Sequence, residues 1–227
     1  MNPTAGMLKM HFRDKWLWLY TPWVILLSSF LVNVIVASFI QEPIYTGGLV
    51  SIFIYMLITG ILILVQTFPF ALGLSQRRTD YFIGTSLMAI ITSTTYSILL
   101  YLLAIIESKL TGGWGLELHY FHLPFLNDGN AMEQLWMYFV LFLNMFFLGL
   151  MISSIFRRFG RSGLFIFSGV TFILCSLGVL LMTYNQWWVD LFNWFAGYTA
   201  FELALWSMPL TVVYALLSFL MLRRATV

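Results

Sequence analysis

The feature that most constrains this chain is a series of long apolar runs without a single charged side chain. A helix that crosses the hydrocarbon core of a bilayer, about 30 Å thick, needs about 20 such residues. A charge at the centre of a crossing helix costs roughly 2.5–3.5 kcal/mol, and the charges of this chain fall between the runs. Continuous runs also favour helices over the alternating strands of a membrane barrel. The sequence therefore predicts six transmembrane helices, at about residues 19–40, 48–74, 81–106, 134–156, 164–184 and 203–222.

The composition agrees with a surface that faces lipid. Hydrophobic residues make up 61% of the chain and charged residues only 9%, whereas soluble domains carry about 25% charged residues. So few charges cannot cover a water-facing surface. The length of 227 residues leaves no room for a second, soluble domain of usual size. We therefore expect one all-α transmembrane permease domain over residues 1–227.

The basic residues predict the orientation of the chain, because cytoplasmic loops carry an excess of Lys and Arg. If the N-terminus is cytoplasmic, Lys109 alone among the basic residues lies outside, and Asp14 and Asp80 alone among the acidic residues lie inside. We therefore expect a multi-pass protein of the cell (plasma) membrane, with a bacterial membrane fitting best and with both termini cytoplasmic. The basic residues placed inside are Lys9, Arg13, Lys15, Arg77, Arg78, Arg157, Arg158, Arg161, Arg223 and Arg224, and the acidic residues placed outside are Glu42, Glu107, Glu117, Asp128, Glu133, Asp190 and Glu202.

Three segments outside the spans have a pattern of their own. Residues 7–18 predict an N-terminal amphipathic interfacial helix that enters the first span, because apolar side chains recur on one face and basic ones can reach headgroups. Residues 107–133 are Gly-rich and polar and predict an external loop. Residues 185–202 are apolar and aromatic but too short to cross and return, so we expect one or two short helices in the outer leaflet. The interfacial residues of the first segment are Lys9, Phe12, Arg13, Lys15 and Trp16.

Sequence motifs for nucleotide binding or hydrolysis are absent. No phosphate-binding loop, H-E-x-x-H, G-x-S-x-G or C-x-x-C motif occurs. His119 and His122, with Glu117 nearby, would share a face if they lay on a helix, as a metal site needs. Chance placement among the aromatic residues of an interfacial loop is the simpler interpretation. We therefore predict no catalytic residue, no metal site and no cofactor in this chain.

Uncharged polar side chains inside the spans have two interpretations. They can hydrogen-bond between helices, or they can line a polar path for a substrate. Helix–helix contact is the simpler interpretation for any one of them. The residues that we consider for a substrate path are Asn33, Gln66, Thr67, Thr94 and Asn144.

The segment that joins the second and third spans carries a compact group of charges, Arg77 and Arg78 with Asp80. An anchor for the membrane topology would explain the arginines, and a docking element for a cytoplasmic partner is the sharper interpretation. Residues 71–84 are similar to the corresponding loop of permease subunits in the ABC type-2 exporter superfamily. Their sequence is Ala71-Leu-Gly-Leu-Ser-Gln-Arg-Arg-Thr-Asp-Tyr-Phe-Ile-Gly84. The entry helix, the aromatic hairpin between spans five and six, and the ending Leu222-Arg223-Arg224 resemble the same family.

The resemblance implies a division of labour between subunits. Permeases of this family pair into a twelve-span homo- or heterodimer, and each half docks on a separate cytoplasmic ABC ATPase that binds ATP and Mg. The entry helix would touch the same ATPase. The ATPase-coupling loop would consist of Ser75, Gln76, Arg77, Arg78, Thr79 and Asp80.

The leading functional hypothesis is the membrane-spanning subunit of an ATP-driven exporter, not an enzyme. A hydrophobic or amphipathic substrate, such as a drug, a lipid or a peptide, suits spans that offer no charge. One alternative is a non-transporting interaction or immunity protein that uses residues 107–133. A less favoured alternative is a lipid-modifying enzyme, for which the inner side offers only Asp14, Asp80 and His11. No nucleic-acid partner is expected.

Overall fold

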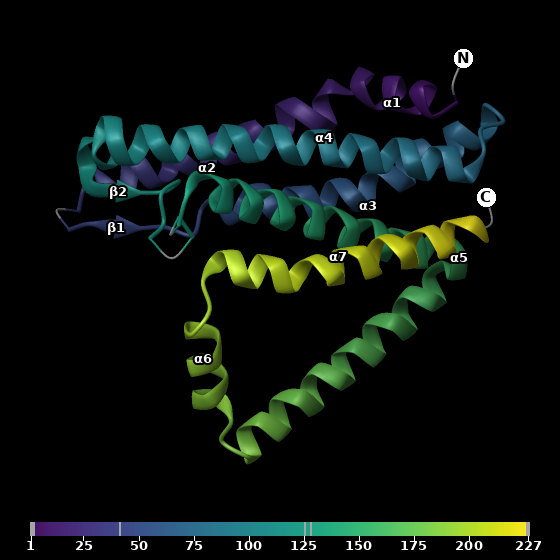
Figure 1. The fold of residues 1–227 in the computed structure, drawn as a ribbon. Coiled ribbons are helices and arrows are strands. Elements are labelled where there is room, and N and C mark those ends of the chain that lie inside the picture. Colours follow the sequence, from purple (N-terminus) through teal and green to yellow (C-terminus); the bar gives the residue numbers. More distant parts are fainter. Residues whose placement is uncertain (1–2, 41, 125, 128, 226–227) are drawn as a thin grey trace.

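The computed structural model describes residues 3–40, 42–124, 126–127 and 129–225. Helices dominate, and five helical stretches are long and apolar enough to cross a membrane by length and composition (Figure 1). The elements are helix α1 (Pro3–Arg13), the π-helical turn η1 (Trp16–Tyr20), helix α2 (Thr21–Ala37), strand β1 (Ile44–Tyr45), helices α3 (Val50–Gly73) and α4 (Arg78–Ile105), the π-helical turns η2 (Ile106–Thr111) and η3 (Gly113–Glu117), strand β2 (Leu118–His119), and helices α5 (Ala131–Tyr184), α6 (Trp188–Ala196) and α7 (Ala200–Arg223).

Helix α5 is 54 residues long and joins the two segments expected as spans four and five. The chain bends at Gly160, whose φ of 68° and ψ of −162° are not helical. Glycine adopts such a conformation without the steric penalty that a Cβ would bring. Each arm of α5 has the roughly 20 residues that a crossing needs. Figure 1 shows the second arm diverging from the bundle, with α6 closing the space back to α7.

The core lies between α3, α4 and the first arm of α5. Its side chains include Phe68, Tyr81 and Phe146, which are fully buried. Two glycines bring α3 and α5 together: a Cβ on Gly60 would lie 2.2 Å from the carbonyl oxygen of Phe146, and one on Gly149 would lie 2.1 Å from that of Leu57. Small residues at these positions let the two backbones approach closely, as in other membrane helix pairs.

The N-terminal helix differs from the predicted interfacial helix over residues 7–18. Helix α1 already begins at Pro3 and ends at Arg13, and Trp16 to Trp18 belong to the π-helical turn that leads into α2. Its packed face is formed by Met7 and His11, which are 3% and 1% exposed. The sequence prediction took the face of Phe12 and Trp16 as the apolar one. His11 makes the packed face look polar in the sequence, and its burial depends on a partner from another helix.

The segment after α4 is more ordered than the predicted external loop. β1 and β2 pair in parallel, with Ile44 opposite Leu118 and Tyr45 opposite His119. Helix α5 then starts with a capping box, in which Asn130 accepts from the backbone of Glu133 and Glu133 accepts from that of Asn130. Asp128, part of the predicted turn here, lies outside the described residues.

One end of the bundle gathers segments that are distant in sequence. Figure 1 shows both termini, the turn between α3 and α4 and the bend of α5 at this end, which we call the charged end because it carries Arg77, Arg78, Arg157, Arg158, Arg161, Arg223 and Arg224. Between the segments predicted as spans five and six, the structure has one short helix, α6. Large apolar side chains are exposed along α2, the second arm of α5 and α6, which is the surface expected for contact with lipid or with another membrane helix.

Candidate functional site

The turn between α3 and α4 is a short connection with a defined backbone. The amide of Ser75 donates to the carbonyl of Leu72 at 2.9 Å, and the amide of Gln76 donates to that of Ala71 at 3.2 Å. Ser75 takes a positive φ of 58°. These bonds satisfy carbonyls at the end of α3 that have no partner within the helix. The turn is therefore built by the backbone, which leaves its side chains available to other partners.

The charges of this turn have different surroundings. Arg77 precedes α4 in an extended conformation and is exposed. Asp80 stands in the first turn of α4, where a negative charge favours the helix dipole. Arg78 is half-buried, and its Nη1 donates to the carbonyl oxygen of Arg223 at 3.0 Å. Arg78 thus holds the end of α7 against the start of α4, whereas Arg77 remains open to solvent.

A second arginine binds a helix backbone at this end. Arg157 lies near the end of the first arm of α5, and its Nη2 donates to the carbonyl oxygen of Val65 in α3 at 2.9 Å. The Nε of Arg157 is buried and has no hydrogen-bond partner among the described residues. The charged end is therefore braced from α4 to α7 and from α5 to α3.

Behind the turn, a polar cluster joins α1, α3 and α4. The hydroxyl of Tyr81 lies 2.8 Å from Oγ1 of Thr67 and 3.2 Å from the carbonyl oxygen of Ile63. His11 lies beside Tyr81, with ring centroids 6.1 Å apart, and its Nε2 is 3.0 Å from Oγ1 of Thr85. Burial lowers the pKa of His11 to about 4, although the charge of Asp14 opposes this shift. A neutral imidazole therefore holds α1 on α4 at physiological pH.

The predicted interfacial residues are exposed on the surface of the protein. Phe12 and Trp16 are 50% and 71% exposed, and Lys9, Arg13 and Lys15 are exposed as well. Aromatic and basic side chains of this kind suit the headgroup level of a bilayer. The packed face of α1 with His11 was missed in the sequence, although Met7 and His11 have the i, i+4 spacing that would have indicated it.

Two of the candidate path residues connect helices. Thr67 joins α3 to α4 through the hydroxyl of Tyr81. Nδ2 of Asn144 donates to Oγ1 of Thr211 at 3.1 Å and so joins α5 to α7. Such bonds between membrane helices are worth about 0.6 kcal/mol on average.

Of the other three candidates, Gln66 adjoins Thr67, whereas Asn33 and Thr94 lie elsewhere in the bundle. Asn33 donates to the carbonyl of Ser29 in its own helix at 2.9 Å. Gln66 is exposed and, together with Thr67, lines a cavity of about 260 Å³ beside α1. Thr94 lines a separate cavity of about 310 Å³ between α4 and α5. Within one copy of the chain, the five candidates do not line a common path.

The opposite end of the bundle is organised by a carboxylate that is fully buried, Glu107. Its Oε1 accepts from the amides of Tyr120 and His122 at 3.0 and 2.8 Å, and its Oε2 accepts from the amide of Phe121 at 2.9 Å. The indole Nε1 of Trp114 adds a fourth bond at 2.8 Å. A charge can be buried when hydrogen bonds replace its water. Glu107 was predicted only as an acidic residue on the outer side, because no local sequence pattern indicates these partners.

The two histidines of this end do not form the helical pair that a metal site would need. His119 lies in β2, and its ring stacks on Tyr45 with centroids 4.7 Å apart. The amide of His122 is engaged with Glu107. Within the described residues, no group of three or more His, Cys, Asp or Glu side chains is placed to hold a metal ion.

Comparison with known protein families, with characterised proteins and with solved structures found no match to this chain. The fold and its charged end have the features of a helical, multi-span membrane protein. A more specific function has to be argued from the arrangement of the residues themselves.

Proposed function

We propose that this chain is the membrane-spanning permease subunit of an ATP-driven ABC exporter. The observation that carries the proposal is the α3–α4 turn, which presents the exposed Arg77 beside Asp80 at the end where both termini gather. A short, backbone-ordered turn with free charges suits docking into a groove of a cytoplasmic ATPase. Without a phosphate-binding loop in this sequence, ATP and Mg would be bound by that partner.

The proposal includes six crossings of the membrane. The two arms of α5 would cross separately, because the bend at Gly160 lies beside Arg157, Arg158 and Arg161, which favour the cytoplasmic side. Both termini would then be cytoplasmic, and α6 would lie in the outer leaflet. The high exposure of apolar side chains on α6 supports this last placement.

The proposed complex contains two permease subunits. The second arm of α5 and α6 have few intrachain contacts for their apolar side chains, and this supports burial against lipid or against a second, identical or related permease. A path for a hydrophobic or amphipathic substrate would then run between the subunits. ATP binding would move the α3–α4 turn, and the brace from Arg78 to α7 would pass that motion to the last span.

The charge reversal Arg77→Glu tests the docking of the ATPase. Arg77 is exposed, so the change should leave the fold intact, while the reversed charge should lower recovery of the ATPase with the tagged chain at least about tenfold, equivalent to about 1.4 kcal/mol. The measurement is quantitative mass spectrometry of ATPase peptides after purification from the native membrane.

The matched control is Lys109→Glu, which makes the same charge change at the opposite end of the bundle. It should recover the ATPase at the wild-type level. Equal recovery with Arg77→Glu and with wild type would contradict the coupling role of this turn. Absence of an ATPase from the wild-type preparation would reject the exporter and favour the interaction or immunity protein, in which the ordered segment around Glu107 would contact the partner.

A further inference from the structure

A cavity of about 270 Å³ opens where α1 gives way to α2, and it lies against α4. Met88, Ile91 and Tyr96 of α4 contribute to its wall, and Asp14 and Lys15 contribute the charges. The volume is slightly below the roughly 300–1,000 Å³ of pockets that hold drug-sized ligands. The cavity therefore suits the headgroup of a larger molecule whose remaining part lies outside.

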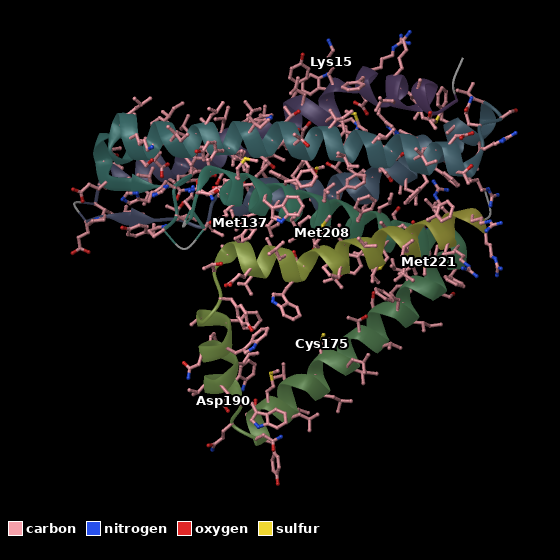
Figure 2. All side chains as sticks on the ribbon, viewed as in Figure 1. Lys15, Met137, Cys175, Asp190, Met208 and Met221 are labelled. Atoms are coloured by element: carbon pink, nitrogen blue, oxygen red, sulfur yellow. The ribbon has the colours of Figure 1, made fainter. Side chains whose placement is uncertain are left out.

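The charges place this cavity at the polar boundary of the bilayer. Lys15 is exposed, and Figure 2 shows it at the edge of the molecule, beside α1. Trp16 and Tyr20, exposed on the same turn, have the amphipathic rings that favour the headgroup level. The apolar side chains of α2 continue from the cavity into the span. A molecule bound here would have its polar group in the cavity and its apolar part along the protein surface.

The polar groups of the cavity have unused hydrogen-bonding capacity. Asp14 accepts from the amide of Leu17 through Oδ1 at 3.2 Å, which leaves Oδ2 available. Trp18 also lines the cavity, but its indole Nε1 is buried out of reach of a ligand there. The charged groups that a ligand in the cavity can reach are therefore Asp14 and Lys15.

We propose that this cavity binds the headgroup of a zwitterionic phospholipid with a protonated amine, phosphatidylethanolamine. The ammonium lies against Asp14, and the phosphate lies against Lys15. Neighbouring charges of opposite sign match a headgroup that carries both signs. An anionic lipid has no ammonium group, so it would leave the carboxylate of Asp14 without a partner from the lipid. The proposal requires only a membrane-spanning chain and is independent of the exporter.

The test uses the purified full-length chain in detergent, without an ATPase, titrated with dioleoyl phosphatidylethanolamine, phosphatidylcholine or phosphatidylglycerol. Bound lipid is counted by native mass spectrometry. Wild type should bind phosphatidylethanolamine about fivefold more tightly than phosphatidylglycerol, the ratio expected for one partly exposed ion pair of about 1 kcal/mol. Phosphatidylcholine should bind more weakly than phosphatidylethanolamine because its ammonium has no N–H to donate.

Four variants separate the proposed contacts from general effects. Asp14→Asn keeps an acceptor for Leu17 and should abolish the preference for phosphatidylethanolamine over phosphatidylglycerol. Lys15→Gln should weaken the binding of phosphatidylethanolamine and of phosphatidylglycerol. Thr95→Phe, on an exposed position of the cavity wall, should fill the space and weaken all three lipids without disturbing the core. Lys9→Gln removes a charge on α1 outside the cavity wall and should change nothing.

Equal binding of phosphatidylethanolamine and phosphatidylglycerol by wild type would overturn the proposal. An unchanged preference in Asp14→Asn would do the same, as would a preference for phosphatidylglycerol, which would assign the cavity to an anionic lipid. If Asp14→Asn proved unfolded by circular dichroism, the result with Thr95→Phe would decide, since unaltered binding with the cavity filled excludes this site.

Discussion

At the scale of single residues, Glu107 shows how a buried charge can order a loop. Its carboxylate accepts from three consecutive backbone amides and from one indole, so it acts as the common acceptor for a segment that has few backbone ladder bonds of its own. The pairing of β1 with β2 covers only two residues on each strand. The order of this end therefore depends on one side chain of η2, directly after α4.

The substitution Glu107→Gln should destabilise this end strongly. An amide of the same shape presents N–H groups where the segment already offers donors, and unmet buried donors should lower the free energy of unfolding by about 3 kcal/mol. The expected results are a lower melting temperature in detergent and faster proteolysis between residues 111 and 124. Glu117→Gln, at an exposed position, is the control and should behave as wild type. Equal proteolysis of both variants would show that Glu107 does not order the segment.

At the scale of elements, α3 and the first arm of α5 pack through a reciprocal pair of glycines. Gly60 of α3 meets the backbone of α5, and Gly149 of α5 meets the backbone of α3. Neither glycine belongs to a G-x-x-x-G repeat, so no sequence motif marks this helix contact. The structure assigns these two glycines to contact within one chain.

Alanine at Gly60 should force these helices apart. The added Cβ would meet a backbone oxygen, which cannot rotate away, so we expect a loss of about 1–3 kcal/mol in the free energy of unfolding. Gly178→Ala is the matched control, because it lies in the second arm of α5 with nothing within 4 Å of its added Cβ. Steric trapping or thermal unfolding in detergent would compare the two. A similar effect of both changes would mean that the cost arises from the loss of glycine rather than from the helix contact.

The length and location of the long helices were predictable, whereas their ends and partners were not. Charge-free runs marked α3, α4 and α7 closely because the cost of burying charge in lipid acts on each residue separately. The segment between the predicted spans 134–156 and 164–184 was not expected to be helical, whereas in the structure α5 runs through it with a bend at Gly160. Contacts such as His11 with Thr85 depend on tertiary packing and leave no local pattern.

The start of α7 is another helix end that was not predicted from the sequence. Glu202 was expected as a solvated residue at the membrane interface. Glu202 is exposed, and its carboxylate also accepts from the backbone amide of Thr199 at 2.8 Å, while Thr199 accepts in return from the amide of Glu202. This capping box begins the last helix. The spacing of Thr199 and Glu202 in the sequence was sufficient to predict it. It was missed because Glu202 was interpreted by its charge alone.

At the scale of the whole molecule, the proposed arrangement depends on the preference of basic residues for the cytoplasmic side of the membrane. Seven arginines from three separate connections or ends gather at the charged end, while Lys109 lies with the segment ordered by Glu107. The proposed six crossings, the cytoplasmic docking turn and the outer position of α6 all require that the charged end is on one side of the bilayer. The side on which each connection lies is therefore the central claim.

Cysteine accessibility in intact cells tests this claim most directly. The native Cys175, which is exposed on the second arm of α5, is first replaced by serine, and single cysteines are then placed at Arg77, Arg158, Arg224, Lys109 and Asp190. A thiol reagent that does not cross membranes should label the cysteines at 109 and 190 in intact cells, and those at 77, 158 and 224 only after the membrane is opened. Labelling of 77 and 158 from opposite sides would contradict the six-span arrangement and the exporter proposal built on it.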